Sequence, residues 1–367
     1  MRNKINYAGP WITAKEVEYV KEAVLNGFYQ NYRLHAKKLE EKLCETLGVK
    51  YVLATNSCTA SLHLAVAALG LQPGDEVITS DSSCVASAIA IAYVGATAVF
   101  VDVDPETWCL SPAAIRKAIT PRTRALLPVH WNGHPAAMDE IMAIAKEHNL
   151  RVIEDAAPAL GAEFRGKKVG TIGDVGCFSF QGAKVAIGGQ GGALVTNDAR
   201  IFEKAQILAS YGRTDSMMQY WSDYVGWNYT MPNLPAALAL AQVERLDELI
   251  AKKRQIFQWY REGLAGLSGV KLIEEAQDTK STCCYPPLLL RDTVRRTREE
   301  VLAEMRKDNI DCRNAQPRIS RMPMFQSRFP NPESERVEKR GVILSSAFNL
   351  TKDDVAFVCQ RLRELAN

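Results

Sequence analysis

The order of apolar runs along the chain constrains its fold more than any other feature of the sequence. Between residues 51 and 153, short β-branched runs alternate with segments that have helical periodicity. The short runs are 51–54, 76–79, 98–101, 125–129 and 151–153, and the helical segments between them are 59–69, 85–93, 112–119 and 138–147. Because parallel strands need crossover connections, this alternation predicts a largely parallel sheet with helices on both faces.

The segments outside this region extend the prediction to two domains. Two amphipathic helical patterns, over 14–24 and 35–47, precede the first strand, and Thr13 with Glu16 forms a capping-box pattern. After Asp155 we expect, in order, a hairpin at 164–169, strands at 175–180 and 193–196, one long helix at 234–264, strands at 270–273 and 285–290, a helix at 296–307, a strand at 342–344 and a helix at 352–365. We predict a large domain over 1–245, which includes the N-terminal helices of 1–48, and a smaller α+β domain over 246–367 after the long linking helix.

Composition excludes several classes of protein. The 367 residues are 47% hydrophobic and 24% charged, as in ordinary globular proteins, and the net charge of +3 comes from interspersed residues that give no support for nucleic-acid binding. The longest apolar runs are too short to cross a membrane, and the N-terminus lacks the apolar core of a signal peptide. The nine cysteines form no C-x-x-C pair, so neither a disulfide framework nor a metal site is expected. We expect a cytoplasmic protein.

Polar residues follow the predicted strands at five places. Ligands gather beyond the carboxyl ends of parallel strands, so these places are candidates for a functional site. They are 56–59, 82–84, 130–134, 154–155 and 179–184.

The segment Asn56-Ser-Cys-Thr lies between a strand and a helix. Its backbone N–H groups and hydroxyls would face an anion at the positive end of the helix dipole, which suits a phosphate. An ordinary Ser/Thr N-cap is the alternative interpretation.

Asp155 and Lys184 are the two residues whose chemistry stands out. Asp155 ends a predicted strand, where its carboxylate could pair with a protonated pyridine nitrogen or cap the following Ala-Ala-Pro turn. Lys184 lies between an apolar strand and a glycine-rich turn, and a desolvated lysine can form a Schiff base with an aldehyde. A phosphate-binding helix start, a carboxylate and such a lysine are the parts of a pyridoxal phosphate site.

With these residues identified, the sequence resembles the DegT/DnrJ/EryC1/StrS family of sugar aminotransferases over essentially the whole chain. The motifs that carry the resemblance begin at Pro73 (PGDEV), Val94 (VGAT), Pro128 (PVH), Val152 (VIEDAAPALGA), Gly173 (GDVGCFSF) and Gly226 (GWNYTM). The resemblance implies an α/β fold of type I, with a mostly parallel seven-stranded sheet between helices and a smaller C-terminal domain. It also implies pyridoxal 5'-phosphate as the cofactor.

The resemblance assigns roles to individual residues. Lys184 matches the Schiff-base lysine, which also carries protons, whereas the related sugar dehydratases have histidine there. Asp155 matches the carboxylate that keeps the pyridine nitrogen protonated. Cys58, Thr59 and Ser179 match the phosphate contacts, the first two largely through their backbone. Asn228 matches an asparagine that reaches the phosphate of the neighbouring subunit's cofactor, so a homodimer with shared active sites is implied.

The sequence departs from the family pattern around the expected cofactor and substrate. Cys84 replaces an aromatic ring that stacks on the cofactor, and Pro158 replaces a polar residue that meets its hydroxyl; both changes weaken contacts to the cofactor. Arg313 matches a position near substrate, Arg33 stands where glycine is usual, and Arg318 and Arg321 are additional cations. These arginines suggest an acidic acceptor or form a solvated basic face. His130 follows a strand and is expected to line the site.

The expected activity is a ping-pong transamination. Glutamate or glutamine donates the amino group, and the acceptor is the carbonyl of a nucleotide-linked keto-deoxysugar used in surface polysaccharide, such as lipopolysaccharide, or related biosynthesis. The same chemistry on an octulosonate-type keto-sugar acid aldehyde or on a cyclitol is an alternative. A second alternative is a non-catalytic ligand sensor, against which the joint retention of Lys184, Asp155, Ser179 and Asn228 argues.

Overall fold

A seven-stranded sheet forms the centre of the computed structural model, which describes residues 3–214, 218 and 220–366. Its strands are β1 (Tyr51–Thr55), β2 (Glu76–Ser80), β3 (Thr97–Val101), β4 (Thr123–Leu127), β5 (Arg151–Asp155), β8 (Val175–Ser179) and β9 (Gly192–Thr196). They are arranged in the order β1-β9-β8-β5-β4-β2-β3. All neighbours run parallel except β9, which is antiparallel to both β8 and β1. This confirms the predicted mostly parallel sheet.

The reversal of β9 follows from its short connection to β8. Residues 180–191 form no helix that could serve as a crossover, and the chain returns in an antiparallel ladder. Gly189 and Gly191 have φ angles of +78° and +137°, and these angles favour glycine at the return. Lys184 lies in this connection.

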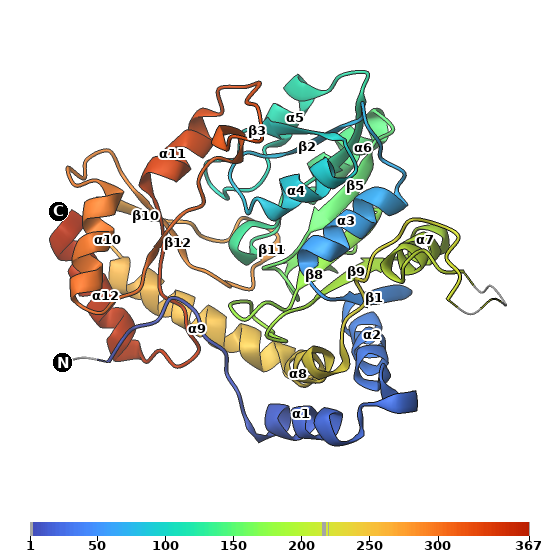
Figure 1. Cartoon of the computed structure of the whole chain (residues 1–367). Helices are drawn as coiled ribbons and strands as arrows, with labels where there is room; N and C mark the ends of the chain where they lie inside the picture. The colour runs from blue at the N-terminus through green and yellow to red at the C-terminus, as the bar shows by residue number, and fades with distance from the viewer. Residues whose placement is uncertain (1–2, 215–217, 219, 367) are drawn as a thin grey trace.

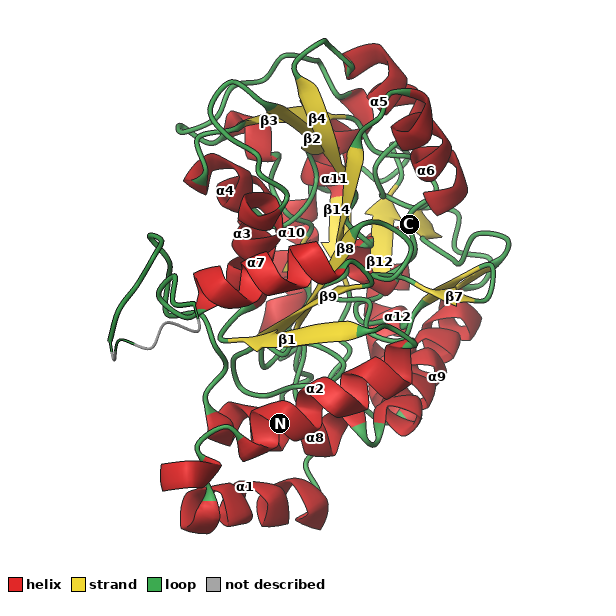
Figure 2. Ribbon diagram, turned by 90° about the vertical axis from the view of Figure 1, so that its right-hand side faces the viewer, coloured by secondary structure: helices red, strands yellow, loops and turns green. Residues whose placement is uncertain are grey.

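Helices cover both faces of the sheet. Figure 2 shows α3 (Cys58–Ala68), α4 (Ala86–Tyr93) and α7 (Ala199–Ala209) on one side, and α5 (Pro112–Ala118) and α6 (Met138–Glu147) on the other. Nine of the eleven residues of α3 are buried, which fits a helix that is apolar around most of its circumference. Most predicted elements lie within a few residues of their expected bounds, but α7 was not predicted.

The N-terminal helices are α1 (Ala14–Asn26) and α2 (Leu34–Leu47), and both pack against α8 (Asn233–Val243). The predicted capping box is present: Thr13 N donates to Glu16 Oε2 over 2.6 Å, and the Thr13 side chain caps the first turn. Short 3₁₀ turns lie at Tyr29–Asn31, Trp131–Gly133 and Ile319–Arg321.

The prediction of one helix over 234–264 is wrong. The chain forms α8 and a separate helix, α9 (Leu246–Leu264), with Arg245 between them at φ −113° and ψ 16°. Arg245 pairs with the buried carboxylate of Glu16 at 2.6 Å and with Glu248 at 2.9 Å. Because Pro235 and Gly263 lie near the two ends of this span and neither is close to residues 244–245, the sequence carries no local signal for this break.

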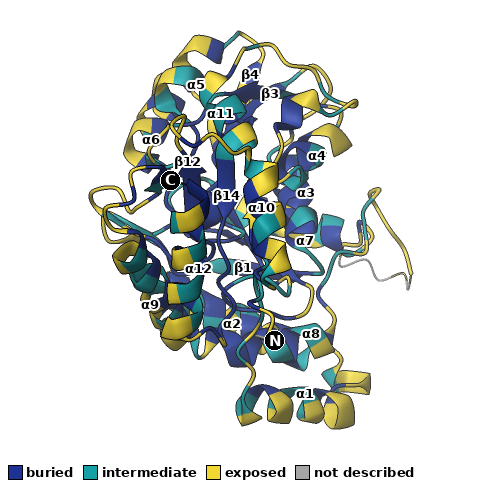
Figure 3. Ribbon diagram, turned by 90° about the vertical axis from the view of Figure 1, so that its left-hand side faces the viewer, coloured by how far each residue is buried: buried dark blue, intermediate teal, exposed yellow. Residues whose placement is uncertain are grey.

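The C-terminal part has its own antiparallel sheet and core. Its sheet order is β10 (Val270–Leu272), β12 (Pro287–Leu290), β14 (Gly341–Ile343) and β13 (Arg313–Asn314), and its helices are α10 (Arg298–Lys307), α11 (Pro332–Arg340) and α12 (Lys352–Ala366). Figure 1 shows that α9 runs from α8 towards these elements, and Figure 3 shows β12 and β14 buried behind α12. Of these elements, β13 and α11 were not predicted.

The N-terminal segment packs against the hydrophobic core of the C-terminal part. Ile5 pairs with Ile310 and is buried in the C-terminal hydrophobic cluster, so both ends of the chain lie in the same region (Figure 1). The division into 1–245 and 246–367 stays a prediction. A small third sheet joins β11 (Thr279–Lys280) to the predicted hairpin of β6 (Glu163–Phe164) and β7 (Lys167–Lys168). No helix among the described residues is both long and apolar enough to span a membrane.

Candidate active site

A cavity of about 330 Å³ lies where the parallel strands end and the C-terminal sheet begins. Asp155 is the last residue of β5, Cys84 follows β2, and Lys184 lies in the connection between β8 and β9. Arg313 and Pro158 also line the cavity. The topology therefore brings five of the residues singled out in the sequence to one place, as expected for an open parallel sheet.

Asp155 is held by protein donors on both of its carboxylate oxygens. Only 3% of its surface is exposed. Oδ2 accepts from the Ser87 hydroxyl at 2.6 Å, and Oδ1 accepts from the Ala157 backbone N–H at 3.1 Å. The carboxylate thus makes the turn contact considered from the sequence and still lines the cavity, where it can pair with a cation on a bound ring.

Lys184 is half-buried at the cavity wall, and its amine lies 5.5 Å from the centre of the Tyr285 ring. No carboxylate of the described residues forms an ion pair with this amine. The Tyr285 hydroxyl donates to the Ala183 carbonyl at 2.8 Å, and Tyr7 stacks on Tyr285 with ring centres 5.2 Å apart. Burial raises the pKa of the Tyr285 hydroxyl well above its usual value, so Tyr285 stays a neutral donor. The two rings hold the chain beside Lys184.

The expected phosphate residues also come together. Ser57 caps α3 by accepting from Ala60 N at 3.1 Å, while the N–H groups of Cys58 and Thr59, in the first turn, have no acceptor within the helix. Ser179 is opposite Gly192 in the ladder between β8 and β9. A Cβ added to Gly192 would lie 2.5 Å from the Cys58 nitrogen, so glycine is required for this close approach.

The start of α3 lies close enough to Asp155 and Lys184 for both charges to act on the Cys58 thiol. Burial, followed by the charge of Asp155, raises the pKa of the Cys58 thiol well above its usual value, and the charge of Lys184 acts on it in the opposite direction. The thiol therefore stays protonated. Its backbone N–H, rather than its sulfur, is the group suited to an anion.

The structure places His130 elsewhere. Its ring is fully buried, with Nε2 3.0 Å from Glu154 Oε2 and Nδ1 accepting from Ala136 N at 3.0 Å. Both ring nitrogens are used within the protein, so the expectation that His130 contacts substrate does not hold. The next two residues, Trp131 and Asn132, line the cavity in its place.

Three of the four arginines expected near substrate do not line this cavity. Arg33 pairs with Glu40 at 3.1 Å, Arg318 with Asp81 at 2.8 Å, and Arg321 with Glu338 at 2.9 Å. Each is paired with a carboxylate, and the partner of Arg318 lies 237 positions away in the sequence, which spacing alone does not predict. Arg313 does line the cavity, and its guanidinium pairs with Asp311 through two hydrogen bonds of 2.7 and 3.0 Å.

Several lining residues were missed from the sequence. They are Tyr7, Tyr285, Asn314 and Gln316, whereas Trp131 and Asn132 belong to the segment 130–134 already marked as a candidate from the sequence. Asn314 and Gln316 follow Arg313 closely in the sequence. Their polar side chains beside an expected substrate residue are the signal that could have identified them. Tyr7 and Tyr285 gave no such signal, because they lie outside the strands and reach this cavity only through tertiary packing.

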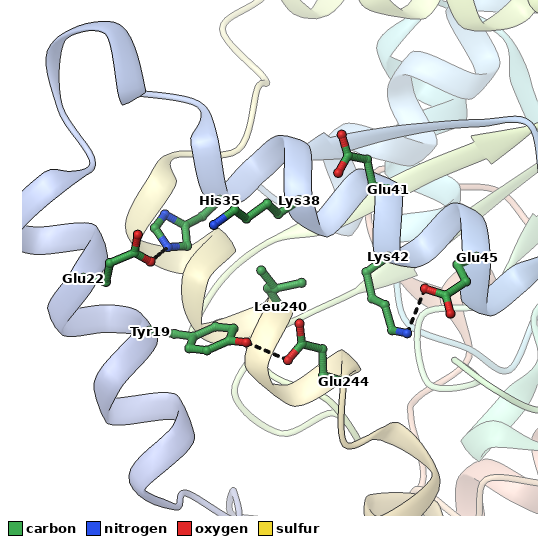
Figure 4. Close-up of a pocket in the computed structure, with 9 residues that line it drawn as sticks. All are labelled: Tyr19, Glu22, His35, Lys38, Glu41, Lys42, Glu45, Leu240 and Glu244. Atoms are coloured by element: carbon green, nitrogen blue, oxygen red, sulfur yellow. Dashed lines mark hydrogen bonds and ion pairs between the residues drawn. The ribbon is translucent and has the colours of Figure 1, made fainter.

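A second cavity, of about 480 Å³, lies between α1, α2 and α8 (Figure 4). Its charged groups are largely paired with one another: His35 with Glu22 at 2.7 Å, Lys42 with Glu45 at 2.9 Å, and the Tyr19 hydroxyl with Glu244 at 2.8 Å. None of the expected catalytic residues lines it. No group of three or more metal-ligating side chains occurs in the described parts of the chain. The cavity with Lys184 is therefore the candidate active site.

Comparison with known proteins agrees with this geometry. Residues 10–363 match the model of the DegT/DnrJ/EryC1/StrS aminotransferase family. GDP-perosamine synthase of Escherichia coli O157:H7 is 37% identical over 97% of this chain and 96% of its own length. A Streptoalloteichus tenebrarius protein, provisionally named an L-glutamine:3-amino-2,3-dideoxy-scyllo-inosose aminotransferase, is 38% identical over 71% of this chain and 64% of its own. The crystal structure of DesI with its TDP-sugar product superposes with a TM-score of 0.91 at 29% identity, over 100% of this chain and 94% of that one.

The fold and the site define a pyridoxal phosphate-dependent transaminase of fold type I. The chain belongs to the DegT/DnrJ/EryC1/StrS aminotransferase family, and it is a sugar aminotransferase. The residues present fit the cofactor. They include the Lys184 amine, which has no ion-pair partner among the described side chains, and the buried carboxylate of Asp155. They also include the start of α3, which Gly192 approaches so closely that a Cβ there would clash with the Cys58 nitrogen.

Proposed function

We propose that this enzyme moves an amino group from glutamate or glutamine to the carbonyl of a nucleotide-linked keto-deoxysugar. The observation that carries the proposal is the convergence of Lys184 and Asp155 on one cavity whose other wall comes from the C-terminal sheet. Similarity to a GDP-perosamine synthase over almost the whole chain supports a nucleotide-linked acceptor. We place the reaction in the cytoplasm, in the synthesis of surface polysaccharide such as lipopolysaccharide.

In this proposal each residue has one task. Pyridoxal phosphate, when bound, supplies an electron sink next to the carbon that gains or loses the amino group. Asp155 would hold the positive charge of the ring nitrogen, with Ser87 and Ala157 N fixing the carboxylate. The amine of Lys184 would carry the cofactor between reactions and move a proton to and from the substrate carbon during them. Cys58 N, Thr59 N and the Ser179 hydroxyl would hold the phosphate.

The active sites are proposed to be shared in a homodimer. Asn228 is exposed and does not line the cavity of its own chain. Its carbonyl accepts from the Asn56 side chain at 3.0 Å, which holds this segment beside the strand end that precedes α3. A second copy of the chain would bring its asparagine to the phosphate end of the neighbouring site. Sedimentation should give a dimer, and Asn228→Ala should weaken retention of pyridoxal phosphate; a monomer that retains the cofactor fully would contradict this part of the proposal.

A cyclitol ketone is the second candidate acceptor, supported by the similarity to the aminotransferase of Streptoalloteichus tenebrarius. A keto-sugar acid loses its main support, because Arg33, Arg318 and Arg321 are already paired with carboxylates. The cavity keeps one lining arginine, Arg313, and this guanidinium is itself shared with Asp311. A non-catalytic sensor would not need the free amine of Lys184 at the wall of such a cavity.

The first test is visible absorbance of the purified protein reconstituted with pyridoxal phosphate. Glutamate and glutamine are added in separate cuvettes, and one of them should bleach the absorbance band of the cofactor bound to Lys184. A band that neither donor changes would argue against both donors.

The acceptor is tested in the reverse direction, because transamination is reversible. GDP-perosamine added to the same enzyme should also bleach the band by acting as amino donor, whereas GDP alone should not. If GDP-perosamine has no effect and an aminocyclitol bleaches the band, the cyclitol alternative is correct.

A further inference from the structure

A buried carboxylate close to the active site has no part in the chemistry proposed above. Asp81 follows β2 directly and is fully buried. It accepts four side-chain or backbone hydrogen bonds from one distant segment: Arg318 Nε at 2.8 Å, Ser320 N at 2.8 Å, the Ser320 hydroxyl at 2.8 Å and Asn331 Nδ2 at 2.9 Å. The Asp81 carbonyl also accepts from Ile319 N at 2.9 Å.

These contacts join two walls of the active-site cavity. On one side, Cys84 lines the cavity three residues after Asp81. On the other side, Arg313, Asn314 and Gln316 line it just before Arg318. We call residues 313–321 the substrate loop. The loop is therefore anchored at Arg318, two residues after Gln316, its last side chain that lines the cavity. The partner of Arg318 is Asp81, which follows β2 of the central sheet, the same sheet whose strand β5 ends in Asp155.

A buried ion pair of this kind is suited to positioning the loop rather than to stabilising the fold. A buried ion pair contributes little net stability, since desolvation of both charges offsets their attraction, and apolar residues of similar size often replace it at no loss. What the pair does supply is direction: Arg318, a residue only 9% exposed, fixes through its guanidinium both the distance and the orientation of the loop relative to β2. Arg318 directs its Nε to Asp81 and does not line the cavity, so its role is to hold the loop and not to contact substrate.

We propose that Asp81 and Arg318 are positioning residues that latch the substrate loop onto the end of β2 and so set the width of the cavity on its substrate side. The inference rests on the proposed transaminase function. It concerns the substrate loop and not the proton-carrying amine, because among the described residues Asp81 and Arg318 make no hydrogen bond to Lys184, to Asp155 or to the start of α3.

The test is Arg318→Gln in the reconstituted enzyme. We expect the concentration of amino donor that half-bleaches the cofactor band to rise about tenfold, since displacement of contacting groups by a fraction of an ångström has effects of this order or larger. The KM for the sugar should rise similarly. The affinity for pyridoxal phosphate, titrated by absorbance, should stay within about twofold of wild type. Arg318→Lys should recover part of the donor affinity, because it keeps the charge.

The matched control is Arg336→Gln, on the exposed part of α11, where the arginine lies 3.8 Å from Glu333. It should leave both titrations unchanged. The latch is overturned if Arg318→Gln weakens donor and cofactor in the same proportion, as a general defect of folding would, or if it changes neither.

Two further arms keep the test decisive. If Asp81→Asn alone fails to fold, the double variant Asp81→Asn, Arg318→Gln removes both charges, and it should fold yet keep the raised donor requirement; a double variant with wild-type donor affinity would overturn the proposal. The donor titration does not depend on the identity of the acceptor. Failure of GDP-perosamine to react would therefore count against the proposed acceptor and leave the latch to be judged by the donor.

Discussion

The Ser87 hydroxyl lies 2.6 Å from Asp155 Oδ2 and joins the first turn of α4 to the end of β5 beneath the cavity. Both residues are buried, so water cannot replace this donor readily. We expect Ser87→Ala to lower the affinity for pyridoxal phosphate about tenfold, which corresponds to losing one hydrogen bond to a charged group, worth about 1.5 kcal/mol. Titration of the apoenzyme with the cofactor measures the change.

The control for this prediction is Ser327→Ala, which removes an exposed hydroxyl that donates to the Phe329 carbonyl at 2.8 Å. It should bind the cofactor like wild type. Unchanged cofactor affinity in Ser87→Ala would mean that Ala157 N alone is sufficient to hold Asp155.

Lys184→Ala should abolish the visible band of the bound cofactor without unfolding the protein. The side chain is half-buried and forms no ion pair in the described structure, so its loss creates neither an unpaired buried charge nor a large void. Absorbance reports the cofactor and circular dichroism reports the fold. Lys167→Ala, at an exposed position of β7, is the comparison. A band that persists in Lys184→Ala would assign the linkage to another lysine.

Cys84→Phe should increase the affinity for pyridoxal phosphate. The Cys84 thiol is exposed at the cavity wall, and the family resemblance described from the sequence implies an aromatic ring stacked on the cofactor at this position. A stacked ring contributes about 0.5–1.5 kcal/mol beyond burial of area, so the dissociation constant should fall about threefold to tenfold. Cys84→Ser, which adds no ring, should not tighten binding. Weaker binding by the phenylalanine variant would show that the cofactor does not lie against this residue.

Lys253 should make stability depend on pH in the alkaline range. Its side chain is 1% exposed, it donates to the Ser346 carbonyl, and burial lowers its pKa from 10.5 to about 8. Between those two values the unfolded chain binds a proton that the folded chain lacks, so this group's contribution to the free energy of unfolding rises with pH. Below pH 8 the buried charge destabilises the fold in full.

Lys253→Met should remove this dependence. The free energy of unfolding of the variant minus that of wild type should fall by about 3 kcal/mol as the pH is raised from 7 to 10.5, because only wild type is stabilised over this range. Urea unfolding at both pH values measures it. Lys252→Met, at the neighbouring position that is not buried, should show little such change. Parallel curves for wild type and Lys253→Met would mean that burial does not lower the pKa of Lys253, so that the side chain stays charged in the folded protein over the same pH range as in the unfolded chain.

Local patterns determined the strands, most helices and the residues at the strand ends. A strand of the central sheet needs only a short apolar run, and its last residue must lie at the edge where parallel strands end, so Asp155 and Cys84 were located from their neighbours in sequence alone. Lys184 was found in the same way, from an apolar strand and a glycine-rich return. Their roles came from the family resemblance, which compares whole motifs.

Tertiary structure decided everything that depends on a distant partner. Arg318 looked like a substrate-binding cation until Asp81, more than two hundred positions earlier, was found beside it. His130 is buried against Glu154, and Arg245, at the break between α8 and α9, pairs with Glu16. In each case a charged or polar group is buried, and a buried group must find a partner wherever the fold supplies one. Sequence spacing records which groups need partners, and only the packed chain determines which partners they meet.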